Sequence, residues 1–238
     1  MPFKRLTFAS QLCDNQNKSN PEFYLKEVVY ISRESGYAVE SFYGTNSFYT
    51  IDSRNNMFAF VETDTPTVNR YASIPHGNYT LNTFLTALQT ALDEAGTYDF
   101  TITNNPLINK LTISATGNFK IIDSMNNCYY ETGFIVSSGF ASSVVAPNPF
   151  DLSGVKVLHI VSSSFGTDSS SVCNKNLNVI ASIPIAVPYL GVVSYFPPLC
   201  VIQCSLVELN SVDFAVFDER FRRLDMNQDW AINILFEN

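Results

Sequence analysis

Any histidine-dependent chemistry in this chain would have to use His76 or His159, because the sequence holds no other histidine. Histidine is the side chain best suited to proton transfer near neutral pH. The patterns that accompany such chemistry, Gly-x-Ser-x-Gly, His-Glu-x-x-His, Gly-x-Gly-x-x-Gly and Gly-x-x-x-x-Gly-Lys-Ser/Thr, are all absent from the sequence. His76 lies in an expected turn and His159 in an expected strand, and we interpret both as structural residues.

Acidic pairs and cysteines are the other groups with catalytic or metal-binding potential. Asp93 with Glu94, and Asp218 with Glu219, could serve glycoside hydrolysis, but adjacent acids at a helix end or in a turn are usually solvated. The cysteines are Cys13, Cys128, Cys173, Cys200 and Cys204. Their odd number, and the lack of Cys-x-x-Cys spacing or nearby histidines, indicate reduced thiols. The sequence therefore predicts no enzyme, no catalytic residues, no cofactor and no metal site.

One basic cluster is present, formed by Arg220, Arg222 and Arg223. On a strand, Arg220 and Arg222 would point to the same face and could contact acidic side chains of a neighbouring subunit or nucleic acid. The alternative, which we favour, is a solvated turn beside Asp218, Glu219 and Asp225. A formal net charge of -8 argues against nucleic-acid binding as the main role, because phosphate binding needs a clustered positive field.

A short amphipathic helix is the clearest element that could position these groups. Its apolar stripe has helical spacing and consists of Leu81, Phe84, Leu85, Leu88 and Leu92. Thr80 is a good N-cap, and Tyr79 before it can pack on Phe84 as a hydrophobic staple. Gly96 is a natural end. The stripe needs a sheet to cover, so the helix belongs to the fold.

Most other segments predict strands. Alternating or β-branched apolar residues separated by turn formers occur at 22–32, 37–43, 48–51, 57–61, 98–102, 111–113, 119–121, 155–161, 177–185, 212–216 and 230–236. Strands at such short intervals favour an antiparallel sandwich or barrel. A chain of 238 residues can form this as one domain. We expect residues 1–20 to be an extended N-terminal arm and 21–238 to be a single domain.

Residues 183–198 are apolar but contain several prolines, which cannot donate to a strand ladder. The segment is either a loop folded over the domain's own core or an apolar contact surface for another subunit. Aromatic residues make up 13% of the chain and charged residues 15%, below the roughly 25% of an average globular protein. This balance fits a subunit rich in interfaces, whose cores are enriched in aromatic residues and depleted of charge.

Several of these segments together resemble a known family. They are Ile74-Pro75-x-Gly77-x-Tyr79 with its leucine-rich helix, the strands around Lys110-Leu111-Thr112-Ile113-Ser114, the segment 183–197, and the ending from Phe217-Asp218 to Asp229-Trp230-x-Ile232-x-Ile234. In this order they resemble the jelly-roll capsid proteins of icosahedral double-stranded DNA viruses, specifically the penton and minor capsid proteins of virophages and polinton-like viruses. The similarity spans about residues 70–236.

The resemblance implies a mainly β fold, an antiparallel two-sheet jelly-roll sandwich with one short inserted helix. It also implies a virion protein, made in the host-cell cytoplasm, that forms a homopentamer at the capsid vertex. Its partners would be the major capsid protein and other capsid subunits, with nucleic-acid contact possible but secondary. A ring of five makes each interface heterologous, so one flank of a copy meets the other flank of the next. The candidate interface residues are Pro188, Tyr189, Tyr195, Phe196, Pro197, Arg220 and Arg222.

Two other functions remain open from the sequence. The first is a carbohydrate- or receptor-binding jelly roll, such as a trimeric spike head, with an aromatic or polar pocket among its loops. The second is an enzyme on a β-sandwich scaffold, which would need His76, His159 or an acidic pair to lie in a cleft. No stretch of about 18 apolar residues is present, so no membrane span is expected.

Overall fold

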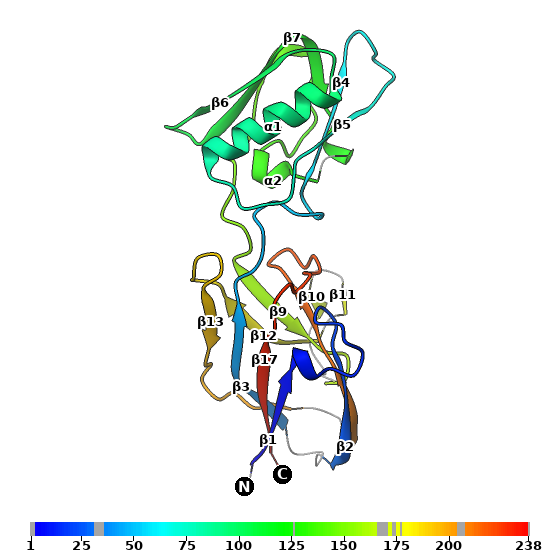
Figure 1. Ribbon diagram of the computed structural model, residues 1–238, viewed down its shortest axis with the longest axis vertical. Helices are drawn as coiled ribbons and strands as arrows, with labels where there is room; N and C mark the ends of the chain where they lie inside the picture. Colours follow the sequence, from blue (N-terminus) through cyan, green and yellow to red (C-terminus); the bar gives the residue numbers. More distant parts are fainter. Residues whose placement is uncertain are drawn as a thin grey trace. The chain divides into compact units, whose positions relative to one another are not determined.

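The structure is a computed structural model that describes residues 3–30, 36–125, 127–165, 171–172, 175–176, 178–203 and 208–237 (Figure 1). The chain divides into two compact units. Met1–Phe48 and Val155–Asn238 form the first, called here the jelly-roll unit, and Tyr49–Gly154 form the second, called here the inserted unit. Each unit has a hydrophobic core of its own. Among the helices of the described residues, none is long and apolar enough to cross a membrane.

The jelly-roll unit consists of short antiparallel strands. They are β1 (Phe3–Ala9), β2 (Glu22–Tyr30), β3 (Gly36–Thr45), β9 (Val157–Val161), β10 (Ser171–Val172), β11 (Lys175–Asn176), β12 (Val179–Pro184), β13 (Val192–Tyr195), β14 (Ile202–Gln203), β15 (Glu208–Asp213), β16 (Ala215–Phe217) and β17 (Ala231–Glu237), with one 3-10 turn at Ser10–Leu12. One sheet has the order β1-β17-β3-β13, and β14 also pairs with β3. In the other sheet, β2 pairs with β15, and β16 joins β9 and then β12.

This order is that of a jelly roll. β15 and β16 are separated by Phe214 alone, so they act as one strand that connects β2 to β9. If the eight main strands are lettered B to I along the chain, one sheet reads B-I-D-G and the other C-H-E-F, the order of two interlocked Greek keys. The predicted mainly β jelly-roll sandwich is confirmed. The inserted unit lies in the connection between β3 and β9.

Aromatic side chains fill the space between the two sheets of the jelly-roll unit. Phe8 of β1 meets Phe23 of β2 and Phe214 edge to face, with ring centroids 5.3 and 5.2 Å apart. These contacts join the sheets at one side, and edge-to-face rings add about 0.5–1.5 kcal/mol each beyond their burial. Trp230 is buried as well, and its indole N–H donates to the carbonyl of Lys18 over 2.9 Å. Strand β17 continues the predicted alternation, with Ile232, Ile234 and Phe236 facing inward.

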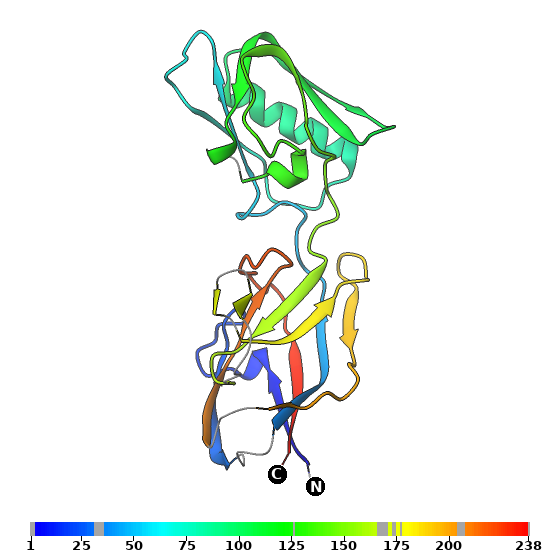
Figure 2. The same ribbon diagram turned by 180° about the vertical axis from the view of Figure 1, so that it is seen from behind.

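The inserted unit is a second antiparallel sheet covered on one face by a helix (Figures 1 and 2). Its elements are β4 (Met57–Glu62), β5 (Arg70–Ser73), α1 (Leu81–Ala95), β6 (Phe100–Asn105), β7 (Lys110–Ile121), a 3-10 turn at Asp123–Met125, α2 (Tyr129–Thr132) and β8 (Ala141–Val145). The strand order is β5-β4-β7-β6, and β8 also pairs with β7. Helix α1 buries Phe84, Leu88, Ala91 and Leu92 against the sheet.

The start of α1 confirms the predicted cap. The Thr80 hydroxyl accepts a hydrogen bond from the Thr83 amide, and the Thr83 hydroxyl accepts one from the Thr80 amide, which completes a capping box. The rings of Tyr79 and Phe84 lie 6.0 Å apart, as expected for a hydrophobic staple. After the helix, the buried carboxylate of Glu62 accepts from the amide of Thr97 over 2.8 Å. Local contacts therefore fix the start of the helix, and Glu62 of β4 holds the chain just after its end.

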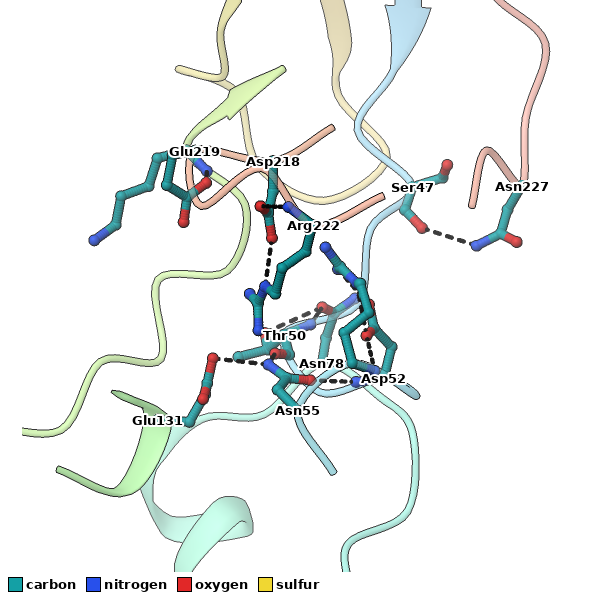
Figure 3. Close-up of polar contacts among 12 residues, drawn as sticks. Ser47, Thr50, Asp52, Asn55, Asn78, Glu131, Asp218, Glu219, Arg222 and Asn227 are labelled. Carbon is teal, nitrogen blue, oxygen red and sulfur yellow. Dashed lines mark hydrogen bonds and ion pairs between the residues drawn. The ribbon is translucent and has the colours of Figure 1, made fainter. Parts of the chain in front are cut away.

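Buried polar groups hold the loops of the inserted unit. The side-chain amide of Asn55 donates to the Thr50 carbonyl over 2.9 Å and to the carboxylate of Glu131, in α2, over 2.8 Å (Figure 3). The Asn78 side chain accepts from the Thr50 amide over 3.0 Å. These bonds order the first residues of the inserted unit after the chain leaves the jelly roll.

The domain organisation differs from the expected arm and single domain. Residues 3–9 of the expected arm form β1, which pairs along its whole length with β17. Residues 21–238 are divided between two units rather than forming one. Both units are antiparallel sheets with the same alternation, so no local pattern marks the boundaries between them. Residues 48–51 also differ, because only Ile51 forms a bridge, to Gly77. Strand β8 and helix α2 lie between residues 121 and 155, where the sequence analysis predicted neither a strand nor a helix.

Candidate subunit-interaction surface

The proline-containing segment lies along one edge of the jelly-roll unit. β13 pairs with β3 and ends the strand order of its sheet, from Val192 opposite Thr45 to Tyr195 opposite Phe42. We call residues 185–202 the β13 flank. Its exposed large apolar side chains are Tyr189, Leu190, Val192, Phe196, Leu199 and Val201. Val192 is 65% exposed and Phe196 63%, so much of their apolar surface faces water in a single copy.

The β13 flank also carries no charge. No aspartate, glutamate, lysine, arginine or histidine occurs from residue 176 to residue 207, although 15% of the chain is charged. A solvated edge strand is usually protected by charged side chains, since its unpaired backbone N–H and C=O groups otherwise invite pairing with another chain. Depletion of charge together with exposed aromatic residues is typical of the core of a protein interface.

The β13 flank continues onto the outward face of the first sheet. Tyr43 of β3 points outward, and its ring meets that of Phe196 edge-on, with centroids 5.4 Å apart. Beside Tyr43, a groove of about 290 Å³ crosses the sheet, and its lining includes the small residues Ala9 and Ala231. The register places Ala9 opposite Ala231 and Ala231 opposite Tyr43. In this row Tyr43 is the one large side chain, between Ala9 and Ala231 on one side and Ser194 of β13 on the other.

A second, smaller pocket lies where the two sheets meet on the β13 flank. Its volume is about 110 Å³, and it is lined by Ile180 and Ala181 of β12 and by Tyr195, Pro197 and Cys200. Because β12 belongs to one sheet and β13 to the other, this pocket opens at the seam between them. Its apolar lining suits one apolar or aromatic side chain rather than a polar ligand.

Five of the predicted interface residues lie on the β13 flank, namely Pro188, Tyr189, Tyr195, Phe196 and Pro197. Pro188, Tyr189 and Phe196 are exposed, and Tyr195 and Pro197 are half-buried. The expectation that this segment is not a central strand agrees with the edge position of the short strand β13. The exposed residues Val192, Leu199 and Tyr43 were not among the candidate residues, although Val192 lies within residues 183–198 and the long uncharged stretch includes Leu199.

Arg220 and Arg222 lie elsewhere, in a turn that follows β16. Figure 3 shows Arg222 beside Asp218. The buried carboxylate of Asp218 accepts from the amides of Arg220 and Arg222 over 2.9 and 2.8 Å. It also accepts from Nε of Arg222 over 2.8 Å. These bonds form the turn that we favoured over a strand, but the turn is not fully solvated, because Asp218 is buried and both arginines are half-buried. A contact between these arginines and a neighbouring subunit remains a prediction.

His159 lies in β9 of the jelly-roll unit, and His76 belongs to the inserted unit. Nδ1 of His159 lies 2.9 Å from the hydroxyl of Ser182, which is its direct partner in the β9–β12 register. One face of the imidazole stacks on Phe221 at 4.5 Å. Burial lowers the pKa of His159, against the opposing effect of the Asp218 and Glu219 charges. His76 is exposed in a loop. Among the described residues, no group of His, Cys, Asp or Glu could hold a metal ion.

The described cysteines are free thiols. Cys13 and Cys128 are buried, and Cys200 is exposed on the β13 flank. Cys173 and Cys204 lie outside the described residues. Burial raises the pKa of the Cys128 thiol well above its ordinary value, and the nearby charge of Glu131 adds to the shift. Cys128 is therefore an unreactive core residue, whereas Cys200 is open to reagents.

Comparison with solved structures finds similarity to the crystal structure of the selenomethionine-labelled mavirus penton protein. The similarity covers 99% of this chain and 99% of that chain, with 9% sequence identity and a TM-score of 0.49. No protein-family model and no curated protein sequence matches the chain.

Proposed function

We propose that the chain is a structural capsid protein, the penton subunit at the vertices of an icosahedral double-stranded DNA virus. Five copies form a closed ring. The observation that carries the proposal is a jelly-roll unit with one uncharged flank on which several large apolar side chains are exposed. Exposed apolar patches of this kind mark interaction sites in soluble proteins.

The jelly-roll unit suits a shell subunit because its two packed sheets form a rigid body whose loops can vary. The inserted unit illustrates this freedom, since it occupies the connection between β3 and β9 and has its own core. The sequence resemblance to virophage and polinton-like capsid proteins gives the same assignment from the residues themselves. Together these features favour a vertex protein over an enzyme.

The partners follow from the position in the shell. In a ring of five, each copy contacts two others through different flanks, and the outer side of the ring contacts the major capsid protein and other capsid subunits. The finished protein is then located in the virion, after synthesis in the cytoplasm of the host cell. Arg220 and Arg222 are candidates for contacts to acidic groups of those neighbours, as Arg is well suited to pair with carboxylates.

The mass of the purified protein in solution tests this proposal. Native mass spectrometry over a dilution series should give a species of five chains that dissociates to single chains on dilution. Replacing Val192 and Phe196 together by aspartate should shift the protein to single chains, because each charge would be placed in an apolar interface. A wild-type protein that stays monomeric at every concentration would contradict the proposal.

A receptor- or carbohydrate-binding spike head is the second candidate, and one feature of the inserted unit favours it. The hairpin between β6 and β7 ends in Leu107, which is 91% exposed, followed by Ile108. Asn105 accepts from the Leu107 amide and holds this tip in place. A trimer in solution, with saturable binding of a glycan, would support this candidate in place of the penton.

A further inference from the structure

We propose that the β13 flank of one copy is covered by the opposite flank of a second copy. Tyr24 of that second copy is placed at the pocket lined by Ile180, Tyr195 and Cys200, called here the seam pocket. This inference rests on the proposed ring and specifies its interface. The opposite flank, called here the β2 flank, consists of β1, the following 3-10 turn and β2. In Figures 1 and 2 the two flanks lie on opposite sides of the jelly-roll unit.

The β2 flank has the side chains that such a contact needs. Leu12 is 74% exposed and Tyr24 is 68% exposed, and Val28 is exposed as well. Tyr24 lies on the outer side of β2, while its neighbour Phe23 points into the core. A protruding tyrosine is among the residues that contribute most to interface energy when a pocket receives it. Lys26 and Glu27 are exposed beside it and supply a polar rim.

The register places Tyr24 and the seam pocket at the same level along the strands. Tyr195, which lines the pocket, is opposite Phe42, and Phe42 is opposite Ile232. Ile232 is in turn opposite Phe8, and the ring of Phe8 contacts that of Phe23, the residue before Tyr24. One row of contacts therefore crosses the unit from the pocket on one flank to Tyr24 on the other.

Leu12 on the β2 flank and Val192 on the β13 flank also lie at matching positions along the strands. Leu12 follows the end of β1, beyond the row in which Ala9, Ala231 and Tyr43 are opposite each other. Val192 lies beyond the same row, because it is opposite Thr45. Leu12 on the β2 flank and Val192 on the β13 flank therefore both lie past that row. Tyr24 on the β2 flank and the pocket on the β13 flank both lie near the row of Tyr195.

In a symmetric ring, residues that lie at the same position along the strands on the two flanks are brought into contact. A rotation about an axis that runs along the strands leaves the level of every residue unchanged. In a closed ring each interface joins two different surfaces of neighbouring copies, and we assign these surfaces to the β13 flank and the β2 flank. Tyr24 then meets the pocket of Ile180, Tyr195 and Cys200, and Leu12 meets Val192. Because the β13 flank has no charged residue, neither Lys26 nor Glu27 faces a residue of like charge in this contact.

Cysteine cross-linking tests the contact. The variant Tyr24→Cys would keep Cys200 and replace Cys173 and Cys204 by serine, leaving Cys13 and Cys128 buried. A short bifunctional maleimide should then link Cys200 of one copy to position 24 of the next, and give covalent species of up to five chains. The control is Asn233→Cys in the same background, since Asn233 is half-buried in β17, an interior strand between β1 and β3.

A second measurement covers the case in which the cysteine variant disturbs the fold. Tyr24→Phe should assemble as the wild type does, whereas Tyr24→Asp should raise the concentration at which the ring dissociates at least tenfold. Circular dichroism would report the fold of both. A pentamer that cross-links no better through position 24 than through position 233, with Tyr24→Asp assembling normally, would overturn this interface while leaving the penton assignment intact. A protein that forms no ring would overturn both.

Discussion

Phe196→Ala should weaken assembly much more than it weakens folding. In a single copy the Phe196 side chain is 63% exposed, and its described ring contact is the edge-on one with Tyr43 at 5.4 Å. Truncation therefore removes one aromatic contact and a minor part of the buried surface. We expect the free energy of unfolding to fall by about 1 kcal/mol, the value of such a contact.

The exposed part of the side chain sets the effect on assembly. Burying a phenylalanine side chain completely is worth about 1.5–3 kcal/mol relative to leaving it in water. Covering the exposed 63% of Phe196 then corresponds to about 1–2 kcal/mol for each interface. The dissociation constant of a contact between two copies should accordingly rise about 5- to 30-fold.

Mass photometry over a dilution series would measure the dissociation constant, and chemical denaturation would measure stability. Phe140→Ala is a matched control, because Phe140 is a partly exposed phenylalanine of the inserted unit, with the Lys120 ammonium 5.1 Å from its ring. Two results would refute the reasoning: a dissociation constant that Phe196→Ala leaves unchanged, or a loss of stability of about 3–5 kcal/mol, which is typical of a core phenylalanine.

Three further predictions concern the stability of the separate units. Asp213→Asn should destabilise the jelly-roll unit by about 1–2 kcal/mol at neutral pH, because the carboxylate accepts hydrogen bonds from the amides and hydroxyls of Ser163 and Ser164. Burial acts to raise the pKa of Asp213, but these hydrogen bonds outweigh it and lower the pKa. The stability that the Asp213 carboxylate adds is therefore fully present at pH values above the ordinary aspartate pKa. It is lost as the pH falls through the lowered pKa of Asp213 in the folded protein, which urea unfolding at several pH values would reveal. Thr80→Ala should lower the unfolding midpoint of the inserted unit by removing a helix cap worth about 1 kcal/mol. Arg70→Met should cost that unit about 3–5 kcal/mol, seen as faster hydrogen exchange in α1, because it leaves the fully buried Glu62 carboxylate without its cation.

Local signals in the sequence were sufficient for the helix and most strands. Thr80, Tyr79 and the leucine stripe specify α1 through contacts within a few residues of each other, and the structure contains each of them. The proline-interrupted segment was equally informative, since prolines exclude a central strand wherever the rest of the chain lies. Five of the candidate interface residues lie in this segment, and their role between copies remains a prediction.

Contacts between distant parts of the chain could not be predicted in this way. β1 was expected to be an arm because its partner, β17, is at the other end of the chain. The outward direction of Tyr43 depends on the register of β3 against β17 and β13, which the sequence does not specify. Arg220 and Arg222 were ambiguous for a similar reason, because the buried carboxylate of Asp218 determines whether that segment turns.

The division into two units leads to a final prediction, that the jelly-roll unit folds without the inserted unit. The two hydrophobic cores share no residue, and no sheet of the described residues contains strands of both units. The two ends of the inserted unit also lie together, because a side chain at Gly154 would be 4.0 Å from Cα of Thr50. A short Gly-Ser linker replacing residues 50–154 would therefore connect the same two points of the jelly roll. We expect this shortened protein to unfold in one cooperative transition and, since both flanks belong to the jelly-roll unit, to form the same ring. Intact folding with loss of the ring would show that the inserted unit supplies the contacts between copies, and the argument from the two flanks would fail.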